Sequence, residues 1–186
     1  MTYFLTFMLA GALAGSPPSD SKTPISVAVA APSPAAIAET LLAADNRRLR
    51  AATPRVLALI TDGIRRSRTF AGLVADLHQT NVIVYVETSM GLPNDVAGRI
   101  LFASAAGDQR YLRVQLRATM PRDTMISVIA HELRHALEVA GEHTVITEKA
   151  LEAFYRRVGD SPHPGGGYDT EAARAAQRLV RSELIG

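Results

Sequence analysis

Two histidines, His131 and His135, stand four positions apart, and Glu132 directly follows the first. On an α-helix such residues lie on one face with Cβ atoms about 5 to 6 Å apart, so both imidazoles could bind one ion. Zinc held by two imidazoles and one carboxylate keeps a position for water and lowers the pKa of that water toward about 7. Glu132 points about 100° away from His131, too far to bind the same ion easily. The pattern therefore predicts a Zn²⁺ site with Glu132 as the general base of a hydrolysis.

A histidine pair on an amphipathic helix without any metal is the alternative interpretation. Three features favour the metal site. The motif lies inside a strongly predicted helix, that helix follows an alternating strand, and acidic residues recur downstream, where a third ligand could come from. Together they give the H-E-x-x-H motif the structural context that a metal site requires, so we prefer the metal site as the hypothesis.

The helix that carries the motif is predicted over residues 123–140, capped by Asp123 and ended by Gly141. One apolar stripe should pack on a sheet; it consists of Ile126, Ile129, Leu133, Leu137 and Ala140. The histidines lie on nearly the opposite side, together with Val128 and Val139. This second face should be covered by the last helix if a later acid is to reach the ion.

The remaining elements predict an α+β fold. Helical periodicity or capping is found over residues 33–53, 54–67, 69–80, 147–158 and 170–184, and strand patterns over residues 81–88, 98–107 and 110–117. In the third strand Leu112, Val114 and Leu116 alternate with Tyr111, Arg113, Gln115 and Arg117, so one face should be wet. We expect a small antiparallel three-stranded sheet packed by helices, with the motif helix following the third strand. Glycines and prolines in residues 159–169 predict an irregular loop.

The motif resembles that of the zincin metallopeptidases, which carry H-E-x-x-H on a helix packed beside a small sheet. The segment "HELRHALEVA" is also similar to small exported bacterial proteins of unassigned function. The resemblance implies zinc on His131 and His135 and Glu132 as general base. It also implies that an edge strand before the motif helix pairs with an extended peptide substrate, and this would be Tyr111 to Arg117.

The resemblance leaves the third ligand open. The metzincin branch has glycine three residues after the second histidine and another histidine three residues later; this chain has Glu138 and Gly141 there, which excludes that branch. A gluzincin-like arrangement would use Glu171, and an aspzincin-like one Asp169, and we weigh the two equally. Either acid could instead belong to the start of the last helix, as an N-cap or as a first-turn acid that the helix dipole favours. Glu148 and Glu152 are the next candidates.

Three further side chains near the motif have possible roles. Glu138 is one turn beyond Arg134 and is expected to form an ion pair or to support a ligand. Tyr168 or His163, in the glycine-rich loop, could donate to the oxyanion of a tetrahedral intermediate. A single Tyr or His in a loop can also be merely exposed or packed.

The N-terminal sequence predicts export. Residues 1–14 resemble a signal peptide, with an apolar run too short to cross a bilayer and a small-x-small pattern at its end. Residues 15–34 read as a flexible tether rich in Ser, Pro and Ala, and residues 35–186 as a single domain. The chain has no cysteine, which excludes a disulfide framework and a thiolate zinc site.

Charge argues against nucleic acid as a partner. The formal net charge is only +2, and the arginine pairs are short, scattered and without interleaved aromatic residues. We therefore predict an exported zinc-dependent hydrolase of the bacterial periplasm or exterior, a peptidase without stable membrane insertion. The alternative is a non-catalytic envelope protein in which the metal is structural or absent and a helical surface binds a partner.

Overall fold

The computed structural model describes residues 39–40, 48–162 and 168–186, all within the unit Pro32–Gly186. The helices are α2 (Pro54–Arg66), α3 (Arg68–His78), α4 (Arg122–Gly141), α5 (Glu148–Val158) and α6 (Glu171–Ile185). The strands are β1 (Leu49–Ala51), β2 (Val82–Ser89), β3 (Gly98–Ala106), β4 (Gln109–Arg117), β5 (Ser161–Pro162) and β6 (Tyr168–Asp169). The predicted signal peptide and tether lie outside the described residues. Within the described part of the chain, no helix is both long and apolar enough to span a bilayer.

The α+β class is confirmed, but the predicted antiparallel three-stranded sheet is wrong. The sheet has four strands in the order β1-β2-β4-β3, and only β3 runs antiparallel to its neighbour. The turn at Gly107, where φ is 58°, joins β3 to β4 as expected. The strand β2 does not pair with β3, which follows it in sequence, but runs parallel to β4. Its apolar run suits this interior position, because Val82, Val84 and Val86 are fully buried on the core face, although Tyr85 on the other face is exposed.

The position of β4 removes it from the substrate role that the resemblance implied. Because β4 lies between β2 and β3, its backbone is paired on both sides. Residues Tyr111 to Arg117 therefore cannot accept an added strand. The open antiparallel edge of the sheet belongs to β3.

The helix predicted over residues 33–53 is wrong at its end. Leu49–Ala51 forms β1, which pairs in parallel with β2 and places Leu49 opposite Val84. Leu49 is buried, whereas Arg50 and Ala51 are half-buried, as suits a short strand at the margin of the sheet. Glu39 and Thr40, earlier in this stretch, are helical.

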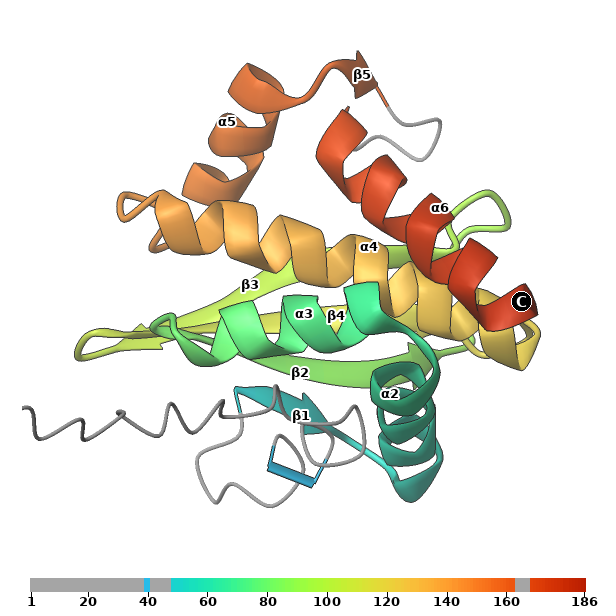
Figure 1. The fold of residues 1–186 in the computed structure, drawn as a ribbon. Helices are drawn as coiled ribbons and strands as arrows, with labels where there is room; N and C mark the ends of the chain where they lie inside the picture. Colours follow the sequence, from blue (N-terminus) through green and yellow to red (C-terminus); the bar gives the residue numbers. More distant parts are fainter. Residues whose placement is uncertain (1–38, 41–47, 163–167) are drawn as a thin grey trace, which may run out of the picture. The chain divides into compact units, whose positions relative to one another are not determined.

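The motif helix α4 lies at the centre of the core. It packs on β2, β3 and β4 and against α2 and α3, and its longest helix contact is with α6 (Figure 1). The predicted stripe residues Ile126, Ile129 and Leu133 are fully buried, and so are Ala136 beside the stripe and Val139 on another side. The last helix therefore packs on the motif helix, as expected. Such burial on several sides fixes the rotation of α4, and with it the direction of its polar side chains.

The start of α4 differs from the prediction. Its N-cap is Pro121, which makes no side-chain capping bond, and the helix starts at Arg122. Asp123, the predicted cap, lies in the first turn and forms an ion pair with Arg66 of α2 at 2.9 Å. A carboxylate there still opposes the positive end of the helix dipole.

The carboxyl end of α4 is held by a buried arginine from β4. The Arg110 guanidinium donates to three backbone oxygens at the helix end, those of Val139 (2.8 Å), Ala140 (3.0 Å) and Glu142 (2.7 Å). It also donates to the Asn81 side chain. The last carbonyls of a helix have no partner within the helix, and a cation there also favours the negative end of the dipole. Arg110 therefore ties the motif helix to the sheet.

Candidate metal centre

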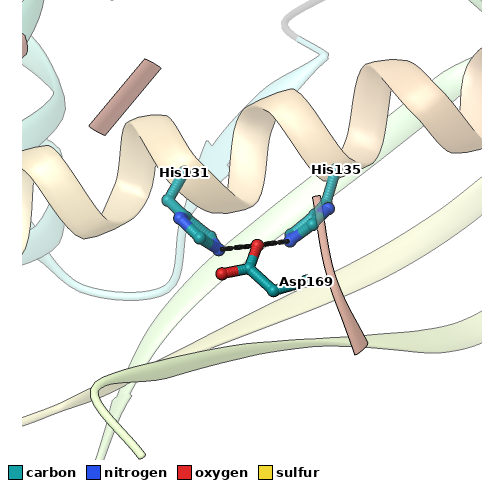
Figure 2. Close-up of side chains that lie close together, drawn as sticks. All are labelled: His131, His135 and Asp169. Carbon is teal, nitrogen blue, oxygen red and sulfur yellow. Dashed lines mark hydrogen bonds and ion pairs between the residues drawn. The ribbon is translucent and has the colours of Figure 1, made fainter. Parts of the chain in front are cut away.

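His131 and His135 point from one face of α4 toward a single carboxylate, that of Asp169 (Figure 2). The two imidazole Nε2 atoms are 3.2 Å apart. The Asp169 Oδ1 atom lies 3.3 Å from Nε2 of His131 and 3.6 Å from Nε2 of His135. All three side chains are buried or half-buried. Two imidazoles and one carboxylate thus converge on one point; the motif predicted the two imidazoles and left the acid open.

Asp169 reaches this point because a short hairpin returns the chain to α4. The strand β6 pairs antiparallel with β5, and Asp160 N–H donates to the Asp169 carbonyl at 3.0 Å. This two-residue ladder corrects the prediction of a wholly irregular loop over residues 159–169. Thr170 is the N-cap of α6, and its side chain accepts from Ala173 N–H. Asp169 is therefore fixed at the junction between a strand and a helix that packs on α4.

The spacing of the three donor atoms fits a single metal ion. Zinc lies about 2.0 to 2.1 Å from imidazole nitrogen and carboxylate oxygen, so two ligands of a tetrahedral ion are about 3.3 Å apart. The observed separations of 3.2, 3.3 and 3.6 Å agree with this value. His131, His135 and Asp169 could therefore hold a metal ion. No fourth protein donor belongs to the group among the residues the structure describes.

A second carboxylate orients His135. Glu138 Oε2 lies 2.9 Å from Nδ1 of His135, and Glu138 Oε1 accepts from the Thr170 hydroxyl at 2.8 Å. A carboxylate partner places a proton on Nδ1 and leaves Nε2 to face the metal position. Tyr155 of α5 donates to the His135 backbone carbonyl at 2.8 Å. The expectation that Glu138 pairs with Arg134 is met only loosely, at 3.8 Å.

Arg174 orients Asp169 from the opposite side. Its guanidinium lies 3.5 Å from Asp169 Oδ2 and donates to both carboxylate oxygens of Asp160, at 2.7 and 2.8 Å. Asp160 also accepts from Glu171 N–H at 3.1 Å. Asp160 and Arg174 thus link the hairpin to the first turn of α6. With Oδ2 facing this arginine, Oδ1 is the oxygen directed at the histidines.

The electrostatics of the group favour a cation. Burial alone would lower the pKa of His135, but hydrogen bonds to Asp169 and Glu138 and the charge of Glu132 raise it to about 9. Burial would raise the pKa of Asp169, but the hydrogen bond to His135 and the charge of His131 lower it to about 2. The acids around these histidines therefore stabilise positive charge, whether a proton or a metal ion carries it.

Glu132 lies beside the ligands without joining them. Its side chain is buried, with 4% of the residue exposed, and burial raises its pKa to about 7. It sits over the start of β3, because a Cβ built at Gly98 would lie 2.9 Å from Glu132 Oε1 and 2.6 Å from Val128 Cγ1. Only glycine leaves room there for the carboxylate. Val128, expected under the last helix, thus contacts β3.

The other candidate ligands lie elsewhere. Glu171 is in the first turn of α6, has a side chain 62% exposed, and pairs with Arg174 and Arg178. Glu152 is exposed and pairs with Arg156, while Glu148 accepts from a backbone N–H of β3. The structure therefore brings Asp169, and neither Glu171 nor these two acids, to the histidines. The side chain of Tyr168 and the whole of His163 lie outside the described residues.

Four residues of this region were missed by sequence reasoning. They are Gly98, Arg110, Tyr155 and Arg174. Only Arg110 could have been found from the sequence. It alternates in step with Leu112, Val114 and Leu116, so the strand pattern directs its side chain toward the apolar core, where a cation needs partners. The other three act through contacts between segments distant in sequence, which a local pattern does not contain.

A candidate metal centre of two histidines and one aspartate is thus defined by its geometry, without the identity of the ion. It joins one helix to a hairpin that follows about 34 positions later in the chain. Comparisons of this chain with models of protein families, with curated proteins and with solved structures found no match.

Proposed function

We propose that this protein is a zinc-dependent hydrolase of the zincin type, and that it cleaves peptide bonds. The observation that carries the proposal is the convergence of His131, His135 and Asp169 beside the buried carboxylate of Glu132. A ligand set of two histidines and one carboxylate with a free acid next to it is what metal-assisted hydrolysis needs. Zinc is the proposed ion because nitrogen and carboxylate donors at this spacing suit a tetrahedral site.

The chain's own residues divide the chemical work. A bound zinc ion would supply Lewis acidity, which lowers the pKa of water and polarises a carbonyl. Glu138 and Arg174 orient His135 and Asp169 by the contacts described above. The Glu132 carboxylate takes a proton from the attacking water and returns it to the leaving amine, so that one peptide and one water give a carboxylic acid and an amine. Tyr168 stays a candidate donor to the oxyanion.

The edge strand β3 is the proposed binding site for an extended substrate. It is the antiparallel edge of the sheet, and it begins at Gly98, directly beneath Glu132. An open edge offers unpaired N–H and C=O groups to an added strand. A peptide paired there would pass the general base. The proposal therefore keeps the edge-strand binding that the resemblance implied and assigns it to β3 instead of Tyr111 to Arg117. Export to the periplasm or exterior stays part of the proposal, carried by the N-terminal sequence.

The decisive experiment is Glu132→Gln, with metal content and peptide cleavage measured on the same preparations. The amide keeps the shape of the side chain but cannot accept the proton. We expect close to one zinc per chain in both proteins. We expect cleavage of a mixed decapeptide library, read by mass spectrometry, to fall by about 10²- to 10⁴-fold.

The same measurement tests the alternative of a non-catalytic envelope protein. That protein would hold the metal and leave the library uncut, before and after the substitution. Equal cleavage by wild type and Glu132→Gln would remove Glu132 from the mechanism. Wild-type protein without bound zinc, iron or manganese after metal exposure would remove the site itself.

A further inference from the structure

The edge of β3 is closed at one point by a side chain. Glu148, the first residue of α5, accepts a hydrogen bond from the Phe102 backbone N–H through Oε2 at 2.6 Å. This bond shows that the Phe102 N–H points away from β4. Along a strand, alternate residues direct their N–H and C=O groups to the same side. Gly98 and Ile100 therefore face the open edge, and Glu148 stands in line with them, where a further residue of an added strand would sit.

The backbone of β3 changes at the same point. The pairing of β3 with β4 shifts register between Phe102 and Ser104, which marks a bulge. A bulge bends a strand and interrupts regular pairing. The regular edge that begins at Gly98 therefore ends at Phe102, independently of Glu148.

Glu148 carries a charge without a counterion among the described residues. The ion pairs of α5 involve Glu152 with Arg156 and Arg157 with Glu142, and no arginine, lysine or histidine of the described chain lies within ion-pair distance of Glu148. The side chain is exposed, and its Oε1 atom accepts no hydrogen bond there. An ionised carboxylate has acceptor capacity on both oxygens, so Glu148 can bind Phe102 and a cation at once.

We infer that Glu148 binds the free α-ammonium group of the substrate, so that the enzyme cleaves near the amino terminus of a peptide. The inference rests on the proposed function and names its substrate class. A side-chain cation would leave the plane of the sheet, whereas Glu148 lies at the edge itself, where only the substrate backbone can meet it. An antiparallel substrate presents its amino terminus at this end, and a parallel one would bring a carboxylate against Glu148.

The length of the edge sets the cleavage position. From Phe102 to Gly98 the strand advances four residues, or about 14 Å at roughly 3.4 Å per residue. Gly98 lies under Glu132, where the scissile bond must be. About three or four substrate residues therefore precede that bond, and the released amino-terminal fragment is short.

The test compares two decapeptide libraries of the same composition, one with free and one with acetylated amino termini. For wild type we expect amino-terminal fragments of three or four residues and a 5- to 10-fold preference, on the order of a charge-assisted hydrogen bond, for the free amines. Glu148→Gln keeps an acceptor for Phe102 N–H and removes the charge, so the preference should fall below about 2-fold. Glu152→Gln, one turn along α5, should retain it.

Each outcome bears on the inference. Equal cleavage of both libraries, or cuts scattered along the peptides, overturns it and leaves the proposed hydrolase intact; Glu148 then only shields a strand edge. If neither library is cut, the proposed function fails, and binding of the same peptides, labelled at their carboxyl ends, decides the inference by fluorescence polarisation. A tighter Kd for free amines that Glu148→Gln abolishes supports the amino-terminal site, and equal Kd values overturn it.

Discussion

The two halves of the candidate metal centre are held by different forces. The half on α4 is held by packing, because Ile129, Leu133 and Ala136, on the core face of the same helix, have no exposed surface. The rest of α6 packs on α4, but the half at β6 and the first turn of α6 is oriented by polar contacts, above all those of Arg174 with Asp160 and Asp169. Substitutions that leave a cavity in a packed core lower the free energy of unfolding by several kcal/mol, whereas half-exposed ion pairs contribute little to it. The histidine half should therefore respond to substitution through stability, and the aspartate half through metal affinity.

The largest expected effect separates the two acids at the start of α6. Asp169→Ala removes a donor that lies 3.3 Å from His131 Nε2, so zinc affinity should fall by at least about 100-fold, the upper range for changes outside the ligand shell. Glu171→Ala removes only an exposed partner of Arg174 and Arg178 and should change zinc affinity less than about 3-fold. Competition with a chelating dye measures both. Tight zinc binding by Asp169→Ala would show that the ligand lies elsewhere.

A substitution of Arg110, the β4 residue that caps the carboxyl end of α4, should affect the packed half alone. Arg110→Met leaves three backbone oxygens near the helix end without their buried donor, and the expected loss is about 3 kcal/mol of unfolding free energy. Arg113→Met, on the same strand but half-exposed, should stay within about 0.5 kcal/mol of wild type. Urea denaturation of the metal-free proteins makes the comparison. Equal midpoints for the two variants would contradict a capping role for Arg110.

Gly98→Ala tests the contact between the packed half and the edge strand. The new methyl group meets Val128 and Glu132 at 2.6 and 2.9 Å, so we expect a loss of about 1 to 3 kcal/mol, retained zinc and reduced hydrolysis. Gly72→Ala is the matched control. It has nothing within 4 Å and lies inside α3, where alanine should stabilise by about 0.5 to 1 kcal/mol. Thermal unfolding and peptide cleavage distinguish the two, and full activity in Gly98→Ala would separate Glu132 from catalysis.

The smallest expected effect concerns Arg174, and its sign is informative. Loss of a positive charge near a cation site should by itself strengthen metal binding. Loss of the contact that orients Asp169 should weaken it, and outer contacts of this kind are worth about 10- to 100-fold. We expect Arg174→Gln to bind zinc about 10-fold more weakly, with Arg178→Gln unchanged. Tighter binding by Arg174→Gln would show that charge outweighs positioning.

The histidine half could be predicted from sequence because it is local. Periodicity placed residues 123–140 in a helix, and the spacing of His131 and His135 then fixed their common face. The hairpin of β3 and β4 was equally local, since a glycine turn joins two adjacent strand patterns. Asp123 shows the limit of such reasoning. It was predicted as the N-cap, but in the structure it lies in the first turn of the helix, where it forms an ion pair with Arg66.

The aspartate half could not be predicted in the same way. Asp169 and Glu171 both suit the start of a helix, and neither the loop before them nor their own preferences indicate which acid faces α4. That choice depends on the pairing of Ser161 with Asp169 and on the packing of α6, both contacts between separate segments. The sheet order was missed for a related reason. The pairing of β2 with β4 skips β3, which lies between them in sequence. Leu49–Ala51 forms a strand because it pairs with the free edge of β2.

The separation of His135 from Asp169 along the chain also gives the ion a mechanical role. An ion shared by these residues closes a loop of roughly 34 residues that contains α5 and the hairpin, as a covalent crosslink would. Because the unfolded chain does not hold the preformed site, the ion stabilises the folded state by mass action, by about 2.7 kcal/mol at a free ion concentration 100 times its Kd. Binding energy that protects the native hairpin is lost when the ion leaves. Chelation should therefore allow β5 and β6 to open locally and be cut by proteases, while the four-stranded sheet and α4 stay folded.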